Sequence, residues 1–142
     1  MPVVKVYLSV PMIANRALSR AELMAKAIED SGNELTSPWV LGQTEKSLSS
    51  VNVFERDRIG SETCEVLVAD VTEPSIGVGM EIMAAYKAGR AIVLVAKKGN
   101  LTSRMLQHMD GKETLEYEDE SEVYEGLRHL LAEISRKNTQ PI

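Results

Sequence analysis

The sequence predicts a doubly wound α/β fold, in which helices cover both faces of a parallel sheet of roughly five strands. Short runs of β-branched residues alternate along the chain with longer segments in which apolar residues recur at helical spacing, as in strand–helix–strand units. The chain has 142 residues, 44% of them hydrophobic, which is enough for one sizeable core without disulfide or metal support. We therefore expect a single domain that spans residues 1–142.

The first expected elements are a strand and a helix. Residues 3–8 form a β-branched run (VVKVYL) that is typical of a buried strand. Residues 16–30 have helical periodicity, and Gly32 is expected to end this helix. The residues predicted to face the core from the helix are Leu18, Leu23, Ala27 and Ile28.

The segments that follow are less regular. Leu35 and Thr36 predict a short second strand. Residues 42–50 are polar and serine-rich, which indicates a loop, and residues 51–61 predict a helix. This helix carries a run of charged residues that would ordinarily be a solvated face, namely Glu55, Arg56, Asp57 and Arg58.

The second half of the chain repeats the alternation. Residues 66–69 (VLVA) predict the third strand, residues 81–88 a helix ended by Gly89, and residues 91–96 the fourth strand. The remaining expected elements are a short helix at 102–109, a weak edge strand at 114–117 and an amphipathic helix at 121–135. Right-handed crossovers between these strands would give a Rossmann- or flavodoxin-like sandwich.

Charge and composition exclude several classes of function. A net charge of −5 without a cluster of Lys and Arg argues against a nucleic-acid-binding surface, because binding to phosphate backbones needs concentrated positive charge. No signal peptide or long apolar span is visible, so we expect a cytoplasmic protein with no membrane partner. The single cysteine, Cys64, cannot form an internal disulfide.

No metal or other cofactor is expected. His108 and His129 lie far apart in the sequence and lack partners at metal-ligand spacing. The chain has no Gly-x-x-x-x-Gly-Lys-Ser/Thr loop for a triphosphate, and no Gly-x-Gly-x-x-Gly follows the first strand as in dinucleotide-binding proteins. A small anionic ligand remains compatible with this composition.

Most of the functional information lies in residues 66–82, VLVADVTEPSIGVGMEI. The apolar run ends in Asp70, passes through a Pro-Ser-Ile-Gly-Val-Gly loop, and is expected to reach Glu81 as a helix begins. In open α/β sheets ligands bind at the carboxyl ends of strands, and N–H groups at a helix start can hold an anion. The residues expected in a strand-to-helix turn that also suits a monophosphate are Ser75, Gly77 and Gly79. The simpler interpretation of Glu81 is a first-turn glutamate favoured by the helix dipole.

The run Ser75-Ile-Gly-Val-Gly-Met-Glu81, with Asp57 placed thirteen residues before Asp70, resembles the 2'-deoxynucleoside 5'-phosphate N-hydrolases, relatives of the nucleoside 2-deoxyribosyltransferases. The resemblance extends from residue 6 to about residue 134. It implies that Glu81 is the nucleophile, that Asp57 is the acid/base, and that Ser75 helps to hold a 5'-phosphate. It also implies a homodimer with shared active sites, because one stretch resembles the family segment that reaches the neighbouring subunit's phosphate site. That stretch is Ser103, Arg104 and Met105.

Two aromatic residues have both a functional and a structural interpretation. Tyr7 matches a family tyrosine near the nucleophile, where its hydroxyl could orient Glu81, although a strand tyrosine is commonly a packed ring with a satisfied hydroxyl. Trp39 could form a stacking wall for the base, or it could be a loop tryptophan that covers the core.

The clearest departure from the family follows the first strand. The mammalian hydrolases carry Gly-Ser-Ile-Arg-Gly-Gly-Arg here, whereas this chain has Val10, Pro11, Met12, Ile13, Ala14, Asn15 and Arg16. Three glycines and an arginine are lost, and Pro11 removes a backbone N–H. This segment is still expected to contact the substrate, with Asn15 and Arg16 as candidates for the phosphate.

The chemistry of an N-glycosidase accounts for two carboxyls. Breaking the bond develops oxocarbenium character at C1', so one carboxylate can attack or stabilise that carbon while a second carboxyl protonates the departing base. Enzymes that retain configuration place the two carboxyls about 5–5.5 Å apart, which is the separation expected between Glu81 and Asp57.

Three functions remain open from the sequence. The first is a nucleotide N-hydrolase that acts on nucleoside 5'-monophosphates. The second is a deoxyribosyltransferase, although that group typically shows Asp-x-Gly-Thr-x-x-Glu; a serine in place of the aspartate removes a negative charge, which favours a substrate that bears a phosphate. The third is a non-catalytic nucleotide-binding module, against which the retention of both Asp57 and Glu81 counts.

Overall fold

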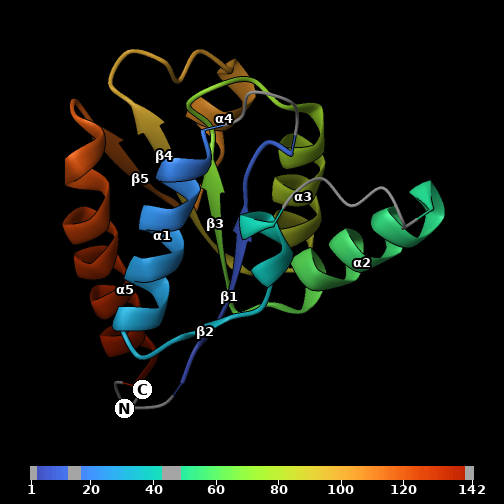
Figure 1. Ribbon diagram of the computed structural model, residues 1–142, viewed down its shortest axis with the longest axis horizontal. Helices are drawn as coiled ribbons and strands as arrows, with labels where there is room; N and C mark the ends of the chain where they lie inside the picture. Colours follow the sequence, from blue (N-terminus) through green and yellow to red (C-terminus); the bar gives the residue numbers. More distant parts are fainter. Residues whose placement is uncertain (1–2, 13–16, 43–48, 140–142) are drawn as a thin grey trace.

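The computed structural model describes residues 3–12, 17–42 and 49–139, and within them it shows a five-stranded sheet in which all strands are parallel (Figure 1). The strands are β1 (Lys5–Ser9), β2 (Glu34–Leu35), β3 (Val66–Asp70), β4 (Ala91–Lys97) and β5 (Lys112–Tyr117). The α-helices are α1 (Leu18–Asp30), α2 (Ser50–Thr63), α3 (Ile76–Lys87), α4 (Arg104–His108) and α5 (Val123–Thr139), and two short 3-10 helices are η1 (Pro38–Leu41) and η2 (Glu120–Glu122). The predicted doubly wound fold is confirmed, with β5 at an edge as expected.

The strand order is β2-β1-β3-β4-β5, so the chain runs outward in opposite directions from β1 and from β3. Such a reversal leaves a crevice at the carboxyl ends of the two central strands, because the connections there depart to opposite sides. β1 ends at this edge, and so does β3, from which the loop into α3 departs (Figure 1). The topology therefore places a ligand site beside β1 and β3.

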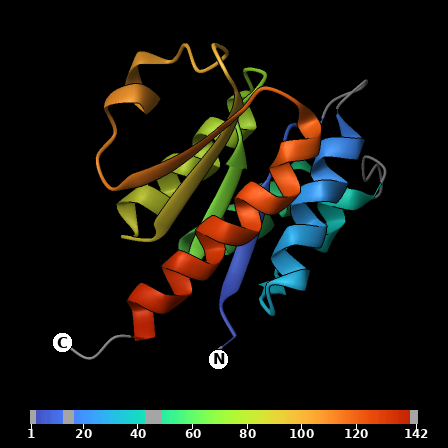
Figure 2. The same ribbon diagram turned by 90° about the vertical axis from the view of Figure 1, so that its left-hand side faces the viewer.

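Two layers of helices cover the sheet. Helices α1 and α5 lie side by side on one face, as Figure 2 shows, and α2 and α3 pack together on the other. Successive strand residues point to opposite faces: Val6 and Leu8 join the core with α1 and α5, whereas Tyr7 joins the core beside α3. This alternation decides which residues of β1 can reach a site between α2 and α3.

One predicted core residue of α1 is exposed. Leu18, the first residue of the helix, is 38% exposed, so its predicted inward orientation is wrong. The buried face at this end is occupied by Arg20, which lies two residues further on and hence about 200° around the helix. The predicted inward positions of Ala27 and Ile28 are confirmed.

The start of α3 also differs from the prediction. The helix begins at Ile76 rather than at Glu81, because the Ser75 hydroxyl caps it by accepting a hydrogen bond from the Val78 N–H at 3.3 Å. Val78 and Ile82, one turn apart, then bury the same helix face against the sheet. Packing of this face outweighs the roughly 1 kcal/mol that each helical glycine costs.

As a consequence, Gly77 and Gly79 lie inside the helix, and the expectation that they form a strand-to-helix turn is wrong. Glu81 is the sixth residue of α3, so its interpretation as a first-turn glutamate is also wrong.

Among the described residues, no helix combines the length and the apolar composition that crossing a bilayer would require.

Candidate active site

A cavity of about 610 Å³ lies between α2 and α3, and both predicted catalytic carboxyls line it. Asp57 comes from α2 and Glu81 from α3, two helices that pack directly on each other. The described residues that line the cavity are Ser50, Val53, Phe54, Asp57, Arg58, Glu62, Gly77, Met80, Glu81 and Ala84. The fold thus brings together two carboxyls that are well separated in the sequence and surrounds them with an apolar rim.

Tyr7, a buried residue of β1, lies close to the two carboxyls. Burial, the charge of Glu81 and hydrogen bonding to Glu81 raise the pKa of the Tyr7 hydroxyl, and Asp57 acts in the same direction. The hydroxyl therefore stays protonated and is available as a donor to either carboxylate. The predicted grouping of Tyr7 with Glu81 is present in this geometry.

The environment of Glu81 sets its protonation near neutral pH. Burial raises the pKa of this carboxyl from 4.5 to about 7, and the nearby charge of Asp57 adds to the increase. Hydrogen bonding to Tyr7, the Ser9 hydroxyl and the charge of Arg56 all lower it. The carboxyl is consequently poised between its neutral and ionised forms at physiological pH.

A helical glycine holds Tyr7 in place. A Cβ at Gly60 would lie 2.6 Å from Cε2 of Tyr7, so only glycine lets α2 approach the ring this closely. The indole of Trp39 meets the Tyr7 ring edge-on, with centroids 6.0 Å apart and an interplanar angle of 65°. Sequence reasoning did not identify Gly60, although a glycine inside a helical pattern is a recognised signal of close backbone approach.

Arg56 is a second residue that sequence reasoning missed. Its Nε lies 2.9 Å from Oδ1 of Asp57, and its guanidinium carbon lies 4.2 Å from the centre of the Trp39 ring. In the sequence Arg56 is one of a run of charged residues, and only the fold shows that it points inward while its neighbour Arg58 pairs with Glu55 and Glu62. The arrangement fixes the carboxyl of Asp57 against the aromatic pair.

The structure places Trp39 beside this site rather than on the cavity wall. Arg56 covers its ring and Tyr7 meets it edge-on, and Trp39 is not among the described residues that line the carboxyl cavity. Its packing against both cores agrees with the structural interpretation. The stacking role stays a prediction.

The predicted phosphate residues border a second cavity on the other side of α3. This hollow of about 530 Å³ lies between α3 and the segment around α4, and Ser75, Gly79, Ser103 and Met105 all line it. Gly77 borders the carboxyl cavity instead, and Arg104 lies exposed in α4. Ser75 and Ser103 both act as helix caps, and each accepts a backbone N–H at 3.3 Å.

Of the segment that departs from the mammalian family pattern, only the first part is described. Val10 and Pro11 are buried, and Met12 is half-buried. Ile13, Ala14, Asn15 and Arg16 lie outside the described residues, and so does the middle of the predicted 42–50 loop.

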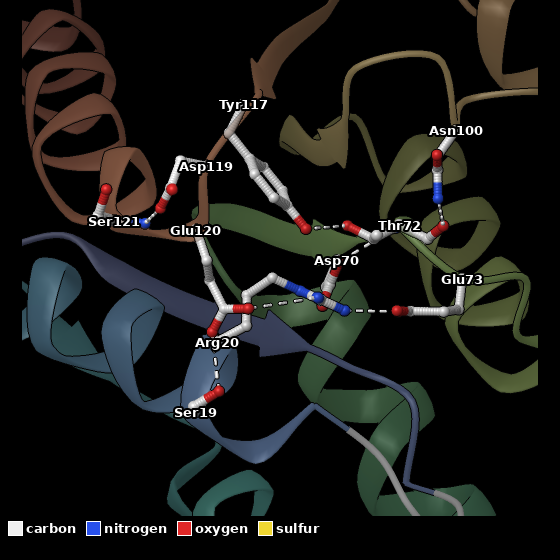
Figure 3. Close-up of polar contacts among 10 residues, drawn as sticks. All are labelled: Ser19, Arg20, Asp70, Thr72, Glu73, Asn100, Tyr117, Asp119, Glu120 and Ser121. Atoms are coloured by element: carbon white, nitrogen blue, oxygen red, sulfur yellow. Dashed lines mark hydrogen bonds and ion pairs between the residues drawn. The ribbon is translucent and has the colours of Figure 1, made fainter.

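Asp70, the carboxylate at the end of β3, belongs to the opposite face of the sheet. Figure 3 shows it paired with Arg20 of α1, whose Nε lies 2.7 Å from Asp70 Oδ2 and whose second nitrogen lies 2.5 Å from Glu73. Thr72 is held in the same region by the Tyr117 hydroxyl at 2.9 Å and by Asn100, whose amide donates to the Thr72 carbonyl. This network, whose centre of Arg20, Asp70, Thr72 and Tyr117 is buried, anchors the loop that leads to Ser75.

Comparisons with known proteins agree in sequence and in fold. A protein of Thermofilum pendens is 36% identical over 103 residues, covering 70% of this chain and 72% of its own length. A protein of Methanococcoides burtonii is 30% identical over 108 residues, covering 72% of this chain and 88% of its own length. Both carry the provisional name 2'-deoxynucleoside 5'-phosphate N-hydrolase 1. No family model matches the chain.

Solved structures show the same fold at lower identity. The CMP N-glycosidase of Clostridium botulinum superimposes with a TM-score of 0.71 at 18% identity, covering 89% of this chain and 98% of that one. A 2-deoxyribosyltransferase of Bacillus psychrosaccharolyticus gives 0.64 at 21% identity, covering 84% and 90%. These likenesses establish the architecture of the chain.

Proposed function

Because this chain belongs to the 2'-deoxynucleoside 5'-phosphate N-hydrolase family, we propose that it is an N-glycosidase that cleaves nucleoside 5'-monophosphates into a free base and a sugar 5-phosphate. The observation that carries the proposal is the convergence of Asp57 and Glu81 on one cavity, with the Tyr7 hydroxyl close to them. Two carboxyls in different surroundings are what cleavage of a glycosidic bond requires.

The proposed reaction has two steps. In the first, a Glu81 oxygen forms a bond to C1' as the bond from C1' to the base nitrogen breaks, and the proton of Asp57 passes to the departing base. In the second, the Asp57 carboxylate takes a proton from water, whose oxygen attacks C1' and releases Glu81. Arg56 keeps the Asp57 carboxyl fixed through both steps.

The burial of Glu81 suits its proposed role. A carboxylate in an apolar site is poorly solvated and is therefore a stronger nucleophile toward an oxocarbenium-like carbon than one in bulk water. Tyr7 supplies a donor that stabilises the ionised form, which is the form that reacts.

The substrate class is tested by comparing a nucleoside 5'-monophosphate with its unphosphorylated nucleoside. We expect kcat/KM to be roughly a hundredfold or more larger for the nucleotide, because two charge-assisted hydrogen bonds to the phosphate are worth on the order of 1.5–3 kcal/mol each. The proposed donors are the Ser75 hydroxyl and the N–H groups at the start of α3, a helix end that borders both cavities, with Gly77 on the carboxyl cavity and Ser75 on the other. Chromatography of released base across a panel of ribo- and deoxyribonucleotides gives the measurement.

Ser75→Gly is the matched variant for this comparison, because glycine also suits an N-cap and leaves the helix start intact. It should reduce kcat/KM for the nucleotide and leave the nucleoside almost unchanged. Equal kcat/KM values for nucleotide and nucleoside in the wild type would refute phosphate recognition.

The same assay separates the three candidate functions. A hydrolase releases base and forms little exchanged nucleotide when a second free base is present in large excess. A deoxyribosyltransferase would instead prefer the bare nucleoside and transfer its sugar efficiently to that base. Binding of nucleotides without any release of base would identify a non-catalytic module.

We further propose a homodimer in which Ser103 and Arg104 of one subunit complete the phosphate site of the other. Large apolar side chains on and near α3 are uncovered within the chain, which supports a second copy on this surface: Ile76 is 87% exposed, Met80 55% and Met105 73%. Large exposed apolar side chains such as these favour contact with another subunit.

Mixing two inactive variants tests the shared site. Glu81→Gln subunits, combined with Ser103→Ala/Arg104→Ala subunits, should recover about a quarter of the wild-type activity, since half of randomly paired dimers have one intact site of two. Each variant mixed only with itself is the control. A protein that is monomeric in sedimentation at concentrations where it is fully active would contradict the shared site.

A further inference from the structure

Ser9 is the last residue of β1, at the carboxyl edge of the sheet where the proposed active site lies. It follows Tyr7 by two positions, so strand geometry directs both side chains to the same face, the one that α2 and α3 cover. Its register partner on β3 is Ala69, which offers no side-chain hydrogen-bonding group. Ser9 is only 1% exposed.

The hydroxyl of Ser9 has no partner of its own. Among the buried side-chain polar atoms of the described residues, its Oγ is the one without a hydrogen-bond partner. Burying a hydroxyl without a partner costs free energy, and alanine would fill the same space without that cost. An unsatisfied donor of this kind in a well-packed sheet calls for a functional explanation.

The Ser9 hydroxyl acts on Glu81, because it lowers the pKa of this carboxyl as Tyr7 does. The charged groups that face Glu81 from the neighbouring helix are Asp57 and Arg56, and Arg58 and Glu62 of the same helix line the cavity. These four charged groups all belong to α2. Ser9, like Tyr7, is instead a neutral hydrogen-bond donor on β1.

We propose that Ser9 is a positioning residue that donates its hydroxyl hydrogen to the ionised Glu81, so that Tyr7 and Ser9 together hold the carboxylate from the strand side. With two donors fixed on β1, one oxygen of Glu81 is held toward the sheet while the other is directed into the cavity. A neutral carboxyl is a weaker hydrogen-bond acceptor than a carboxylate, so the hydrogen bond from Ser9 reaches its full strength only when Glu81 is ionised. The existence of this contact does not depend on the reaction, but its catalytic meaning rests on the proposed function.

The contact is measurable without turnover. In protein labelled with ¹³C at the glutamate carboxyl, NMR titration follows Glu81, whose resonance is assigned by its absence in Glu81→Gln. Ser9→Ala should move the titration midpoint of Glu81 upward by about half a pH unit or more, roughly a threefold change in the proton affinity. Ser9→Cys, which keeps the shape but donates weakly, should move it in the same direction by less.

Ser135→Ala is the matched control, because Ser135 is a buried serine of α5 on the other face of the sheet. It should leave the Glu81 midpoint unchanged. The acid limb of the pH profile of kcat/KM should shift in Ser9→Ala by the same amount as the NMR midpoint, an effect that a merely structural role would not produce.

The two proposals fail separately. An unchanged Glu81 midpoint in both Ser9→Ala and Ser9→Cys, with normal release of base by the wild type, overturns the role of Ser9 and leaves the N-glycosidase proposal standing. A shifted midpoint in a protein that releases no base from any nucleotide supports the Ser9 contact and overturns the proposed function.

Discussion

Replacing Glu81 with glutamine is expected to lower base release by roughly a thousandfold or more, because removal of a covalent nucleophile typically costs several orders of magnitude. Glutamine keeps the volume and the hydrogen-bonding reach of the side chain, so the cavity and nucleotide binding should survive. Release of base is measured by chromatography and nucleotide binding by calorimetry. Retention of more than about a tenth of the wild-type turnover would rule out the nucleophile.

The same variant carries a prediction for stability. The pKa of Glu81 is raised in the fold from 4.5 to about 7, so ionisation of this carboxyl opposes folding as the pH rises through that window. Glu81→Gln removes this opposition, and its melting temperature at pH 8 should equal or exceed that of the wild type. The difference should shrink toward pH 4, where the carboxyl is protonated both in the folded and in the unfolded chain.

Activity should change with pH in the direction opposite to stability. Because the ionised carboxylate is the reactive form, kcat/KM of the wild type should have an acid limb centred near pH 7, with activity falling as the pH decreases through it. An acid limb centred near pH 4.5 would mean that the substrate-free site leaves Glu81 solvated.

Asp57→Asn should have the second largest effect, a loss of roughly a hundredfold or more for ordinary bases, since general acid catalysis typically contributes 10²–10⁴-fold. Asparagine can still accept the hydrogen bond from Arg56, so the side chain should keep its place. A base that is already activated as a leaving group needs no proton from the enzyme, and its release should be slowed much less. Comparison of the two kinds of substrate in wild type and variant is the measurement.

Glu55→Gln provides the control for that experiment, because Glu55 lies on the same helix, pairs with Arg58 at 2.7 Å and is not among the described residues that line the cavity. It should lose little activity with either substrate. An equal loss for ordinary and activated bases in Asp57→Asn would show that Asp57 is not the acid.

Much of the fold could be predicted from local patterns. The buried strands β1, β3 and β4 are β-branched runs, and α1 and α5 have strong helical periodicity, so physical spacing alone located them. The start of α3 could not be placed in this way. Its first turn contains two glycines, which predict a turn locally, and only packing of Val78 and Ile82 on the sheet makes that turn helical.

The site was predictable only in part, because it also depends on packing between elements that are distant in the sequence. The resemblance to the N-hydrolase family pointed to Glu81 and Asp57, and the fold brings both to one cavity. Asp70 ends the strand that leads into the motif, yet its parity along β3 turns it to the opposite face of the sheet, where it pairs with Arg20. Arg56, Gly60 and Ser9 were missed because their importance depends on packing against residues of other elements, which no local pattern records.

Direct detection of the sugar on the enzyme tests the central claim, that Glu81 attacks C1' of a nucleotide. Asp57→Asn is mixed with a nucleotide bearing an activated base, quenched in acid within milliseconds to seconds, digested and mapped by mass spectrometry. This variant forms the glycosyl intermediate without an acid but lacks the base that activates water, so the intermediate should accumulate. The proposed mechanism predicts a sugar 5-phosphate adduct on the peptide that contains Glu81. An adduct on another side chain, or release of base with no adduct at any time, would contradict it.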